Sequence, residues 1–421
     1  MKVIVLGAGV IGVTSAYFLA RAGHQVTVLE KNSSPGLGSS YANGCQLSYS
    51  HIRPWASSSS LLSLPAALLS SDSFLSIQDF SDKSLRWMFE FYKNVLAQSS
   101  YKNSKKLFRI SSHSKEWMKR ILQDEEGVEF NYQNSGILHF YRNQRKFNAA
   151  IKYSQFQDSI GCKSQILTPQ ECVEKESTLV KLLDSKKLVG GIFYPEDASG
   201  DSLAFTRALE KISQQKYGVL FKYNTSIKNI LTNHKKITGI NTDSEVLVAD
   251  KYIYALGAYG DNLLSGIKIN TKIYPVKGYS LSISADENFI APKLPLIDPE
   301  NKMFYSRIGD VFRVAGAIEI SGFKNNLNKS LINFLQNSAR STFSDFGNTN
   351  EMSQWQGFRP FRPNSLPLIC EVKKYGNLFL NTGHGSLGWT LAAGSAKILS
   401  DLVSGKGDKN FDFLEEELAE D

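Results

Sequence analysis

The residues with the clearest chemical role lie near the start, in VIVLGAGVIGVTSAYFLARAGHQVTVLE, residues 3–30. Gly7, Gly9 and Gly12 form G-x-G-x-x-G: the first glycine permits a tight turn, the second lets backbone approach a pyrophosphate, and the third lets a helix pack closely on a strand. Glu30 follows at close to the spacing expected of a carboxylate that binds a ribose hydroxyl. These residues predict a site for an adenine dinucleotide and leave FAD and NAD open.

A pair of arginines, Arg359 and Arg362, lies in WQGFRPFRPNSLP at 355–367. Each precedes a proline, which biases it towards extended backbone. An arginine held in this way can present its planar guanidinium to a carboxylate through two parallel hydrogen bonds. The alternative is two surface arginines in an irregular turn, and the residues alone do not decide between the two.

A second glycine-rich turn, TGHGSLG at 382–388, follows a predicted strand at 378–381 and precedes a predicted helix at 390–403. A helix N-terminus stabilises negative charge, which a reduced flavin carries on its pyrimidine side. A nicotinamide has no such need, because its positive charge disappears on reduction. A nucleotide motif at the start and this helix near the end therefore favour FAD.

The elements that position these residues follow from the spacing of apolar side chains. Residues 3–6 and 25–29 are typical of strands buried in a parallel sheet, with a helix between them at 13–22. The apolar stripe at 85–96 is interpreted as the core face of a helix. The segment 49–84 is rich in serine and leucine, and three interpretations stay open: a lid, a membrane-contacting flap, or a surface excursion. Further strands are predicted at 136–141, 219–222, 226–231, 237–241 and 245–249, at the start of the segments 190–201 and 251–261, and within 270–320. Further helices are predicted at 110–122, 144–160, from 203, and at 327–339.

Composition limits the possible classes. A chain of 421 residues, 42% of them hydrophobic, can bury a large core and should form two lobes. The formal charge is +8, and its scattered Lys and Arg indicate either a solvated basic surface or attraction to an anionic membrane or acidic substrates. The chain has no run of basic residues of the kind that would suggest nucleic-acid binding. The four cysteines form no CxxC pair, so no metal site or disulfide framework is expected. With no signal-peptide pattern and no apolar run of ~18 residues, a cytoplasmic or peripheral protein is expected.

Over nearly its whole length, the chain resembles the D-amino acid dehydrogenase (small-subunit type) branch of the D-amino-acid-oxidase-like FAD enzymes. The likeness is carried by the first thirty residues, by SSYANGCQLS, IYPVKGYSLS, RVAGAIEISGF and WQGFRPFRPNSLP, and above all by NTGHGSLGWTLAAGSAKILSDLVSG. It implies an α/β fold: a Rossmann-type FAD-binding domain with an α+β, antiparallel-sheet substrate domain, as in glycine oxidase and D-amino acid oxidase. We assign 1–84, 166–265 and 359–421 to FAD binding, and 85–165 and 266–358 to the substrate domain.

The resemblance also implies roles for individual residues. Arg359, the first arginine of the GFRP motif, is expected to bind the substrate carboxylate, and Tyr279 to line the same pocket. Tyr49, His51 and Tyr305 are expected at the lid. The residues expected to bind FAD are Gly7, Gly9, Gly12, Glu30, Lys31, Ser39, Ser40, Asn43, Gln46, Ile227 and Gly257, with Gly383, His384, Gly385, Leu387 and Gly388 beside the isoalloxazine.

Two departures from the branch concern the loop after Glu30. The branch usually reads Asn-Ala-Gly-Gln, whereas this chain has Asn43-Gly44-Cys45-Gln46. Covalent attachment of the flavin through Cys45 is one hypothesis, but a small buried thiol is the commoner outcome. The lid of the branch often offers an aromatic hydroxyl where this chain has His51, so Tyr49 is a candidate for that role.

The activity implied is oxidative deamination of a D-amino acid, with small apolar substrates such as D-alanine favoured. Arg359 would orient the substrate so that its Cα–H faces flavin N5 and a hydride is transferred. Burial beside a cation favours the neutral amine, so no dedicated base is required, and His384 is interpreted as a turn residue. A quinone or other non-oxygen acceptor is expected at the cytoplasmic face of the inner membrane. Two alternatives stay open: an oxygen-using oxidase of glycine, sarcosine or another secondary amine, and a non-catalytic or RNA-modifying flavoprotein.

Overall fold

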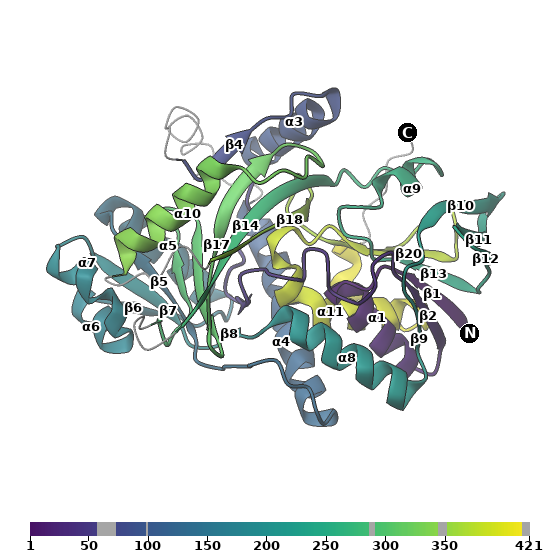
Figure 1. Cartoon of the computed structure of the whole chain (residues 1–421), viewed down its shortest axis with the longest axis horizontal. Helices are drawn as coiled ribbons and strands as arrows, with labels where there is room; N and C mark the ends of the chain where they lie inside the picture. Colours follow the sequence, from purple (N-terminus) through teal and green to yellow (C-terminus); the bar gives the residue numbers. More distant parts are fainter. Residues whose placement is uncertain (57–72, 98–99, 286–290, 344–351, 415–421) are drawn as a thin grey trace.

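The G-x-G-x-x-G segment lies at the centre of a six-stranded sheet in the computed structural model, which describes residues 1–56, 73–97, 100–285, 291–343 and 352–414 (Figure 1). Its first strand, β1 (Lys2–Leu6), pairs in parallel with β2 (Gln25–Leu29) and with β13 (Lys251–Tyr254). The edge strand β9 (Leu220–Lys222) is parallel to β2, and β20 (Leu378–Thr382) is parallel to β13. The other edge strand, β19 (Leu368–Glu371), is antiparallel to β20.

Both faces of β1 are buried, as the sequence predicts for a central parallel strand. Val3 and Val5 pack on the helical side. Ile4 and Leu6 pack on the opposite side, against a small antiparallel sheet. The helices are α1 (Val10–Arg21), α4 (Ser100–Asp124), α8 (Ser202–Tyr217) and α11 (Gly388–Val403), and the small sheet is β10 (Ile227–Asn233), β11 (Lys236–Thr242) and β12 (Val246–Leu247).

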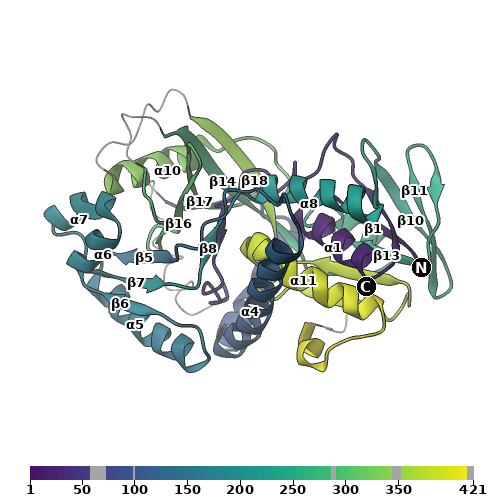
Figure 2. The ribbon, with the colours of Figure 1, turned by 90° about the horizontal axis from the view of Figure 1, so that it is seen from below.

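Local signals set the ends of these helices. Asp201 accepts hydrogen bonds from the backbone N–H groups of Leu203 and Ala204, which caps α8 as its sequence predicts. Gly218 ends α8 in the left-handed conformation. Helix α4 lies beside α11, seen from below in Figure 2.

A nine-stranded, largely antiparallel sheet builds the other lobe. Helix α10 (Lys329–Thr342) covers one face of it (Figure 1). The opposite face turns towards the six-stranded sheet and lines the cavities described below. The strand order is β18 (Ser353–Phe361), β14 (Tyr274–Ser284), β17 (Val311–Ile320), β16 (Met303–Ile308), β15 (Leu296–Asp298), β5 (Ile137–Tyr141), β7 (Gly190–Tyr194) and β6 (Gln165–Leu167), and β4 (Leu75–Ile77) pairs with β17.

Short elements complete the described fold. They are β3 (Gln46–Leu47), β8 (Ala198–Ser199), α3 (Asp82–Leu96), α5 (Gln144–Ser159), α6 (Pro169–Lys175), η1 (Ser177–Leu179), α7 (Val180–Asp184), α9 (Asp261–Ser265), η3 (Gly385–Leu387) and η4 (Lys409–Leu414).

Strand pairing bears on the domain boundary predicted between residues 165 and 166. Both β6 and β7 pair within the nine-stranded sheet, so residues 166–194 lie with that sheet and not with the six-stranded sheet. Likewise β18 runs across the boundary predicted between 358 and 359. Short strands carry no sequence signal for the sheet they join. With these shifts, the division into two domains stays a prediction.

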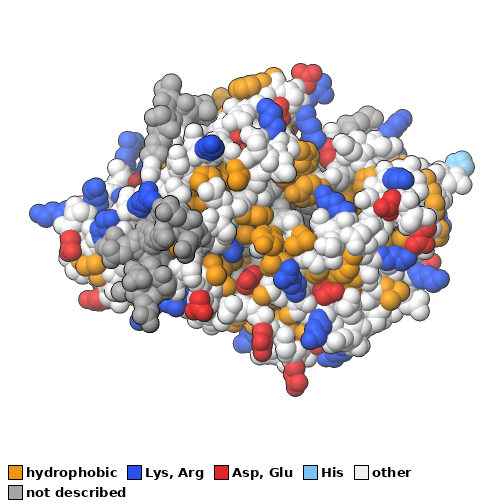
Figure 3. Space-filling view, in the orientation of Figure 1, with side chains coloured by type: hydrophobic (Ala, Val, Ile, Leu, Met, Phe, Trp, Pro, Cys, Tyr) orange, Lys and Arg blue, Asp and Glu red, His pale blue; other side chains and the backbone are white. Residues whose placement is uncertain are grey.

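Helix α3 forms where the apolar stripe predicts a helix, but only part of the stripe packs inward. Leu85, Phe89, Tyr92 and Leu96 are exposed, at 45–59% of their full surface, whereas Val95 is buried together with Trp87 and Phe91. Both faces of this helix are apolar, so periodicity alone could not tell which face packs inward. The exposed face lies at the upper edge of the view in Figure 3.

Part of the serine- and leucine-rich segment, residues 57–72, lies outside the described residues, so the three interpretations of it stay open. Among the residues that the structure describes, no helix is both long and apolar enough to cross a membrane.

The contact between α4 and α11 requires a glycine. A Cβ atom at Gly394 would lie 2.7 Å from the backbone nitrogen and 2.8 Å from the Cα of Ser114. We therefore expect Gly394→Ala to destabilise the FAD-loaded protein by about 1–2 kcal/mol, because overpacking outweighs the gain in helix propensity. Thermal unfolding would measure this. Gly407→Ala is the control, since its Cβ would lie 3.5 Å from Leu402 in ordinary contact; equal losses for both variants would contradict the assignment.

Candidate active site

A cavity of about 590 Å³ lies between the two large sheets. It runs from the end of β2, beside Glu30, to the turn before α11, beside His384. The predicted cofactor residues that line it are Gly7, Gly9, Glu30, Lys31, Ser39, Ser40, Asn43, Gln46, Ile227, Gly257, His384, Gly385, Leu387 and Gly388.

The end of the cavity near Glu30 is shaped for a nucleotide. Gly7 has φ of 99°, and a Cβ there would lie 2.9 Å from the carbonyl oxygen of Ala255. The Glu30 carboxylate is held in place, because it accepts the backbone N–H of Ala8 at 2.8 Å and that of Asn32 at 3.0 Å. Gly9, the N-cap residue of helix α1, supplies no side-chain cap, and the Ser40 hydroxyl accepts the backbone N–H of Val10 at 3.0 Å. The other backbone N–H groups of the first turn and the positive end of the dipole are left for a pyrophosphate.

Gly12 and Gly383 do not line the cavity, although both were predicted to bind the cofactor. A Cβ on Gly12 would lie 1.9 Å from the carbonyl oxygen of Gly7, so this glycine serves the contact between helix and strand. Gly383 has φ of 78° and lies against the side chain of Arg362. Both glycines shape the backbone around the cavity.

The opposite end of the cavity is formed by the glycine-rich turn and by α11, whose N-terminus also has no side-chain cap. His384 is buried, and its Nε2 lies 3.0 Å from the hydroxyl of Ser395. Burial lowers the pKa of His384 to about 3, so its imidazole is neutral. The buried Oδ1 of Asn381 has no hydrogen-bond partner in the described structure and also lines this end. A polar ring system fits here.

The loop at 39–46 connects the two lobes. Ser39 donates to the carbonyl of Phe358 at 2.5 Å, and the Gln46 amide donates to the carbonyls of Leu296 and Tyr305 at 3.1 and 3.2 Å. Cys45 has φ of 57°, a left-handed conformation that favours glycine. This agrees with the glycine that the resemblance gives at that position.

Arg359 extends from β18 across β14, where its guanidinium lies over Gly278. A Cβ on Gly278 would lie 2.2 Å from the guanidinium carbon. Arg359 donates to the carbonyls of Ala317 at 3.2 Å and Gly316 at 3.5 Å, which a bulge in β17 turns towards it. In the described structure it pairs with no carboxylate, and burial lowers its pKa to about 10, which leaves it charged at neutral pH.

Arg362 has a different environment. Its side chain is buried and donates to the carbonyls of Thr271 and Leu366, both at 3.1 Å. The structure therefore separates the two arginines of the motif: Arg359 lines the cavity, and Arg362 binds backbone.

Tyr279, predicted in the carboxylate pocket, and Tyr305, predicted at the lid, have hydroxyls on the α10 side of the nine-stranded sheet. Successive side chains of a strand alternate between faces, so Tyr279 points away from Gly278 and its hydroxyl donates to Glu319. The Tyr305 hydroxyl lies 3.5 Å from that of Thr342 on α10. The structure does not bring either hydroxyl to Arg359, although Tyr279 is among the residues that line the cavity.

The predicted lid residues also separate. Tyr49 packs in the core beside α4, where its carbonyl accepts the hydroxyl of Ser111 at 2.7 Å, and it lines neither cavity. His51 lines the large cavity and a second, adjoining cavity of about 220 Å³. Phe304, one residue before Tyr305, lines both cavities as well.

Several lining residues were missed by the sequence analysis. The Tyr259 ring lies under the Lys31 ammonium at 4.5 Å. Arg53 and Lys302 line the second cavity. Arg53 precedes Pro54, the same signal that marks Arg359, so it could have been found; Lys302 lies in a turn that carries no such signal.

Comparisons with known proteins agree with this geometry. The family described as FAD dependent oxidoreductase matches residues 2–402. Two relatives named D-amino acid dehydrogenase are each 36% identical: that of Paramagnetospirillum magneticum (strain ATCC 700264 / AMB-1) over 408 residues and that of Neisseria meningitidis serogroup C (strain 053442) over 411, each covering 96% of both chains.

Solved structures share the fold. Glycine oxidase from Bacillus cereus ATCC 14579 is 22% identical with a TM-score of 0.73, covering 96% of this chain and 98% of its own. L-proline dehydrogenase from P. horikoshii is 18% identical with a TM-score of 0.73, covering 99% of both chains. The predicted fold class and cofactor are confirmed. The chain belongs to the FAD-dependent oxidoreductase family typified by D-amino acid oxidase.

Proposed function

We propose that this enzyme catalyses the oxidative deamination of D-amino acids to 2-oxo acids and ammonium, with a quinone or other non-oxygen electron acceptor. The relatives named D-amino acid dehydrogenase support the substrate class. The single observation that carries the proposal is Arg359: a charged, buried guanidinium without a carboxylate partner in the described structure, at the junction of two cavities.

Arg359 binds the substrate carboxylate in this proposal. The two backbone carbonyls that it contacts fix its orientation, so an incoming carboxylate meets a preorganised guanidinium. The flavin, when bound, supplies the acceptor for the hydride from the substrate Cα. With the carboxylate fixed on one side, only one enantiomer turns its Cα–H towards the ring while its side chain enters the second cavity.

No protein base is needed at the amine. Burial beside the Arg359 cation disfavours the ammonium form and so favours the neutral amine. His384 keeps its hydrogen bond to Ser395, and its lowered pKa keeps it neutral. These residues position the substrate and exclude water, and the imino acid hydrolyses after release.

Substitutions at Arg359 test its role in binding the substrate carboxylate. Arg359→Ala is expected to retain FAD and its yellow colour while kcat/KM for D-alanine falls roughly 100-fold or more, because one partner of a buried charge pair is lost. Arg359→Lys should lose less, since it keeps a charge but not the planar fork. Steady-state dye-reduction assays measure both. Arg120→Ala, on the exposed side of α4, is the control; normal turnover by Arg359→Ala would refute the assignment.

Gly278→Ala tests the same site without removing a charge. The added methyl group would displace the guanidinium of Arg359, so we expect a similar fall in kcat/KM. Gly266→Ala is the matched control, because its nearest Cβ contact would be an ordinary 3.5 Å. Unchanged kinetics in Gly278→Ala would contradict the placement of Arg359.

Two surface features bear on the electron acceptor and on the RNA-binding alternative. The exposed apolar residues of α3, Leu85, Phe89, Tyr92 and Leu96, offer a surface for a membrane that holds quinone. On the face drawn in Figure 3, Lys and Arg are interspersed with Asp and Glu and form no stripe, which disfavours an RNA-binding role. We propose peripheral contact with the cytoplasmic face of the inner membrane.

Aerobic turnover separates a dehydrogenase from an oxidase. With D-alanine in air-saturated buffer, we expect rapid reduction of an artificial dye and little hydrogen peroxide. L-alanine should reduce the flavin far more slowly than D-alanine. Peroxide formed in equal amount to the oxo acid, or turnover of glycine or sarcosine above that of D-alanine, would favour the oxidase alternative.

We also propose that FAD is bound without a covalent link to Cys45. Burial raises the pKa of the Cys45 thiol to about 12, so it stays protonated and weakly nucleophilic at neutral pH. Acid precipitation of the holoenzyme should release the flavin into the supernatant, and a Cys45→Ser variant should behave identically. Flavin that stays with the wild-type precipitate and leaves the variant would show a covalent bond.

A further inference from the structure

The second cavity extends the site beyond Arg359. It shares His51, Phe304, Arg359 and the turn at 384–387 with the large cavity. A substrate bound through its carboxylate to Arg359 therefore has its side chain within reach of the second cavity. The volume of the second cavity is about 220 Å³, whereas one molecule of liquid water takes up ~30 Å³. The cavity has more room than the methyl group of alanine fills.

Two cations line this cavity besides Arg359. The Arg53 guanidinium lies 3.6 Å from the centre of the Tyr153 ring. Lys302 lies in the turn between β15 and β16, with φ of 56°. Within the described part of the chain, neither side chain forms an ion pair with a carboxylate.

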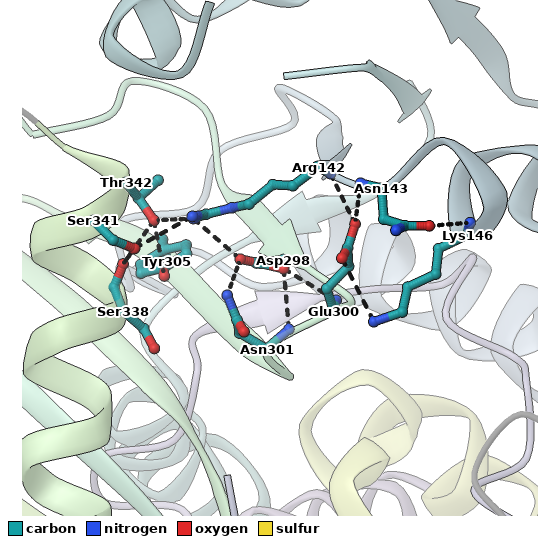
Figure 4. A network of polar contacts seen from close by, with 10 residues as sticks. All are labelled: Arg142, Asn143, Lys146, Asp298, Glu300, Asn301, Tyr305, Ser338, Ser341 and Thr342. Carbon is teal, nitrogen blue, oxygen red and sulfur yellow. Dashed lines mark hydrogen bonds and ion pairs between the residues drawn. The ribbon is translucent and has the colours of Figure 1, made fainter. Parts of the chain in front are cut away.

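The acids of the same turn are already engaged (Figure 4). Asp298 pairs with Arg142 at 3.3 Å and accepts the side-chain amide of Asn301 at 2.8 Å. Glu300 accepts the backbone N–H of Arg142 at 2.8 Å and pairs with Lys146 at 3.5 Å. This network holds the turn in place, and neither Asp298 nor Glu300 forms an ion pair with Lys302.

The pKa values of the groups that line the second cavity reflect its positive charge and its burial. Burial, together with Arg53 and Lys146, lowers the pKa of Lys302 to about 8, so the lysine is largely charged at neutral pH. Burial, together with Lys302 and Arg53, lowers the pKa of His51 to about 4. The buried Nε2 of His139, which also lines this cavity, has no hydrogen-bond partner in the described structure. The cavity thus offers positive charge and an unsatisfied polar atom.

We propose that Arg53 and Lys302 form a second anion site, and that the preferred substrates are D-amino acids with a carboxylate side chain, such as D-glutamate. Arg359 binds the α-carboxylate, and the two cavity cations bind the side-chain carboxylate. This rests on the proposed function and replaces the expectation of a small apolar side chain. The net charge of +8 favours the approach of such a substrate.

The test compares D-glutamate with D-glutamine, which has nearly the same shape and no side-chain charge. The wild-type holoenzyme is expected to favour D-glutamate in kcat/KM by about tenfold or more. Lys302→Met should abolish most of that ratio, and Lys302→Arg should retain it. Lys268→Met is the matched control, since Lys268 has a similar left-handed φ of 57° but is exposed and away from the cavity.

A binding measurement keeps the test independent of turnover. 2-Oxoglutarate and 2-oxopentanoate differ only at the terminal carboxylate, and each can be titrated against the flavin absorption spectrum. Tighter binding of 2-oxoglutarate that is lost in Lys302→Met would support the anion site, whether or not a D-amino acid reduces the flavin. Failure of every D-amino acid to reduce the flavin would refute the proposed function and leave the anion site standing. Equal binding of the two oxo acids, or turnover of D-alanine or D-phenylalanine above that of D-glutamate, would overturn the inference.

Discussion

The charge of Arg359 constrains the architecture around it. A buried guanidinium without a counterion is costly. Arg359 contacts no carboxylate among the described residues, and the backbone carbonyls of Gly316 and Ala317 that turn towards it stabilise its charge. Those carbonyls require the bulge in β17, where Ala317 takes φ of 54°. The guanidinium also needs Gly278, since any side chain there would occupy its position. Three neighbouring strands are thus shaped around one cation, and in the proposed function the substrate carboxylate offsets the remaining cost.

Each lobe contributes a different part of the chemistry. Beside the six-stranded sheet, the N-termini of α1 and α11 lie at the large cavity, and neither N-cap residue supplies a side-chain cap. These helix ends suit a phosphate group and an electron-rich ring. The nine-stranded sheet presents side chains from alternate positions on the face opposite α10. In the proposed function, substrate recognition therefore depends on which face of a strand each side chain occupies, and cofactor recognition depends on helix N-termini.

This division explains what the sequence could predict. The glycine motif, Glu30, the cap at Asp201 and the second glycine-rich turn are local patterns, and the structure contains the elements that they indicate. The face on which Tyr279 or Tyr305 lies depends on register with neighbouring strands, which no local pattern carries. Lys302 enters the cavity through a turn held by Arg142, a residue far away in the sequence. The apolar residues on both faces of α3 likewise concealed which of them pack inward.

The bonds of Gln46 have a consequence for its substitution. One amide, carried on a loop that borders the flavin cavity, donates to carbonyls on two strands of the opposite lobe. Gln46 also lines the large cavity. Its replacement would therefore alter the cavity wall and the contact between the two lobes at the same time.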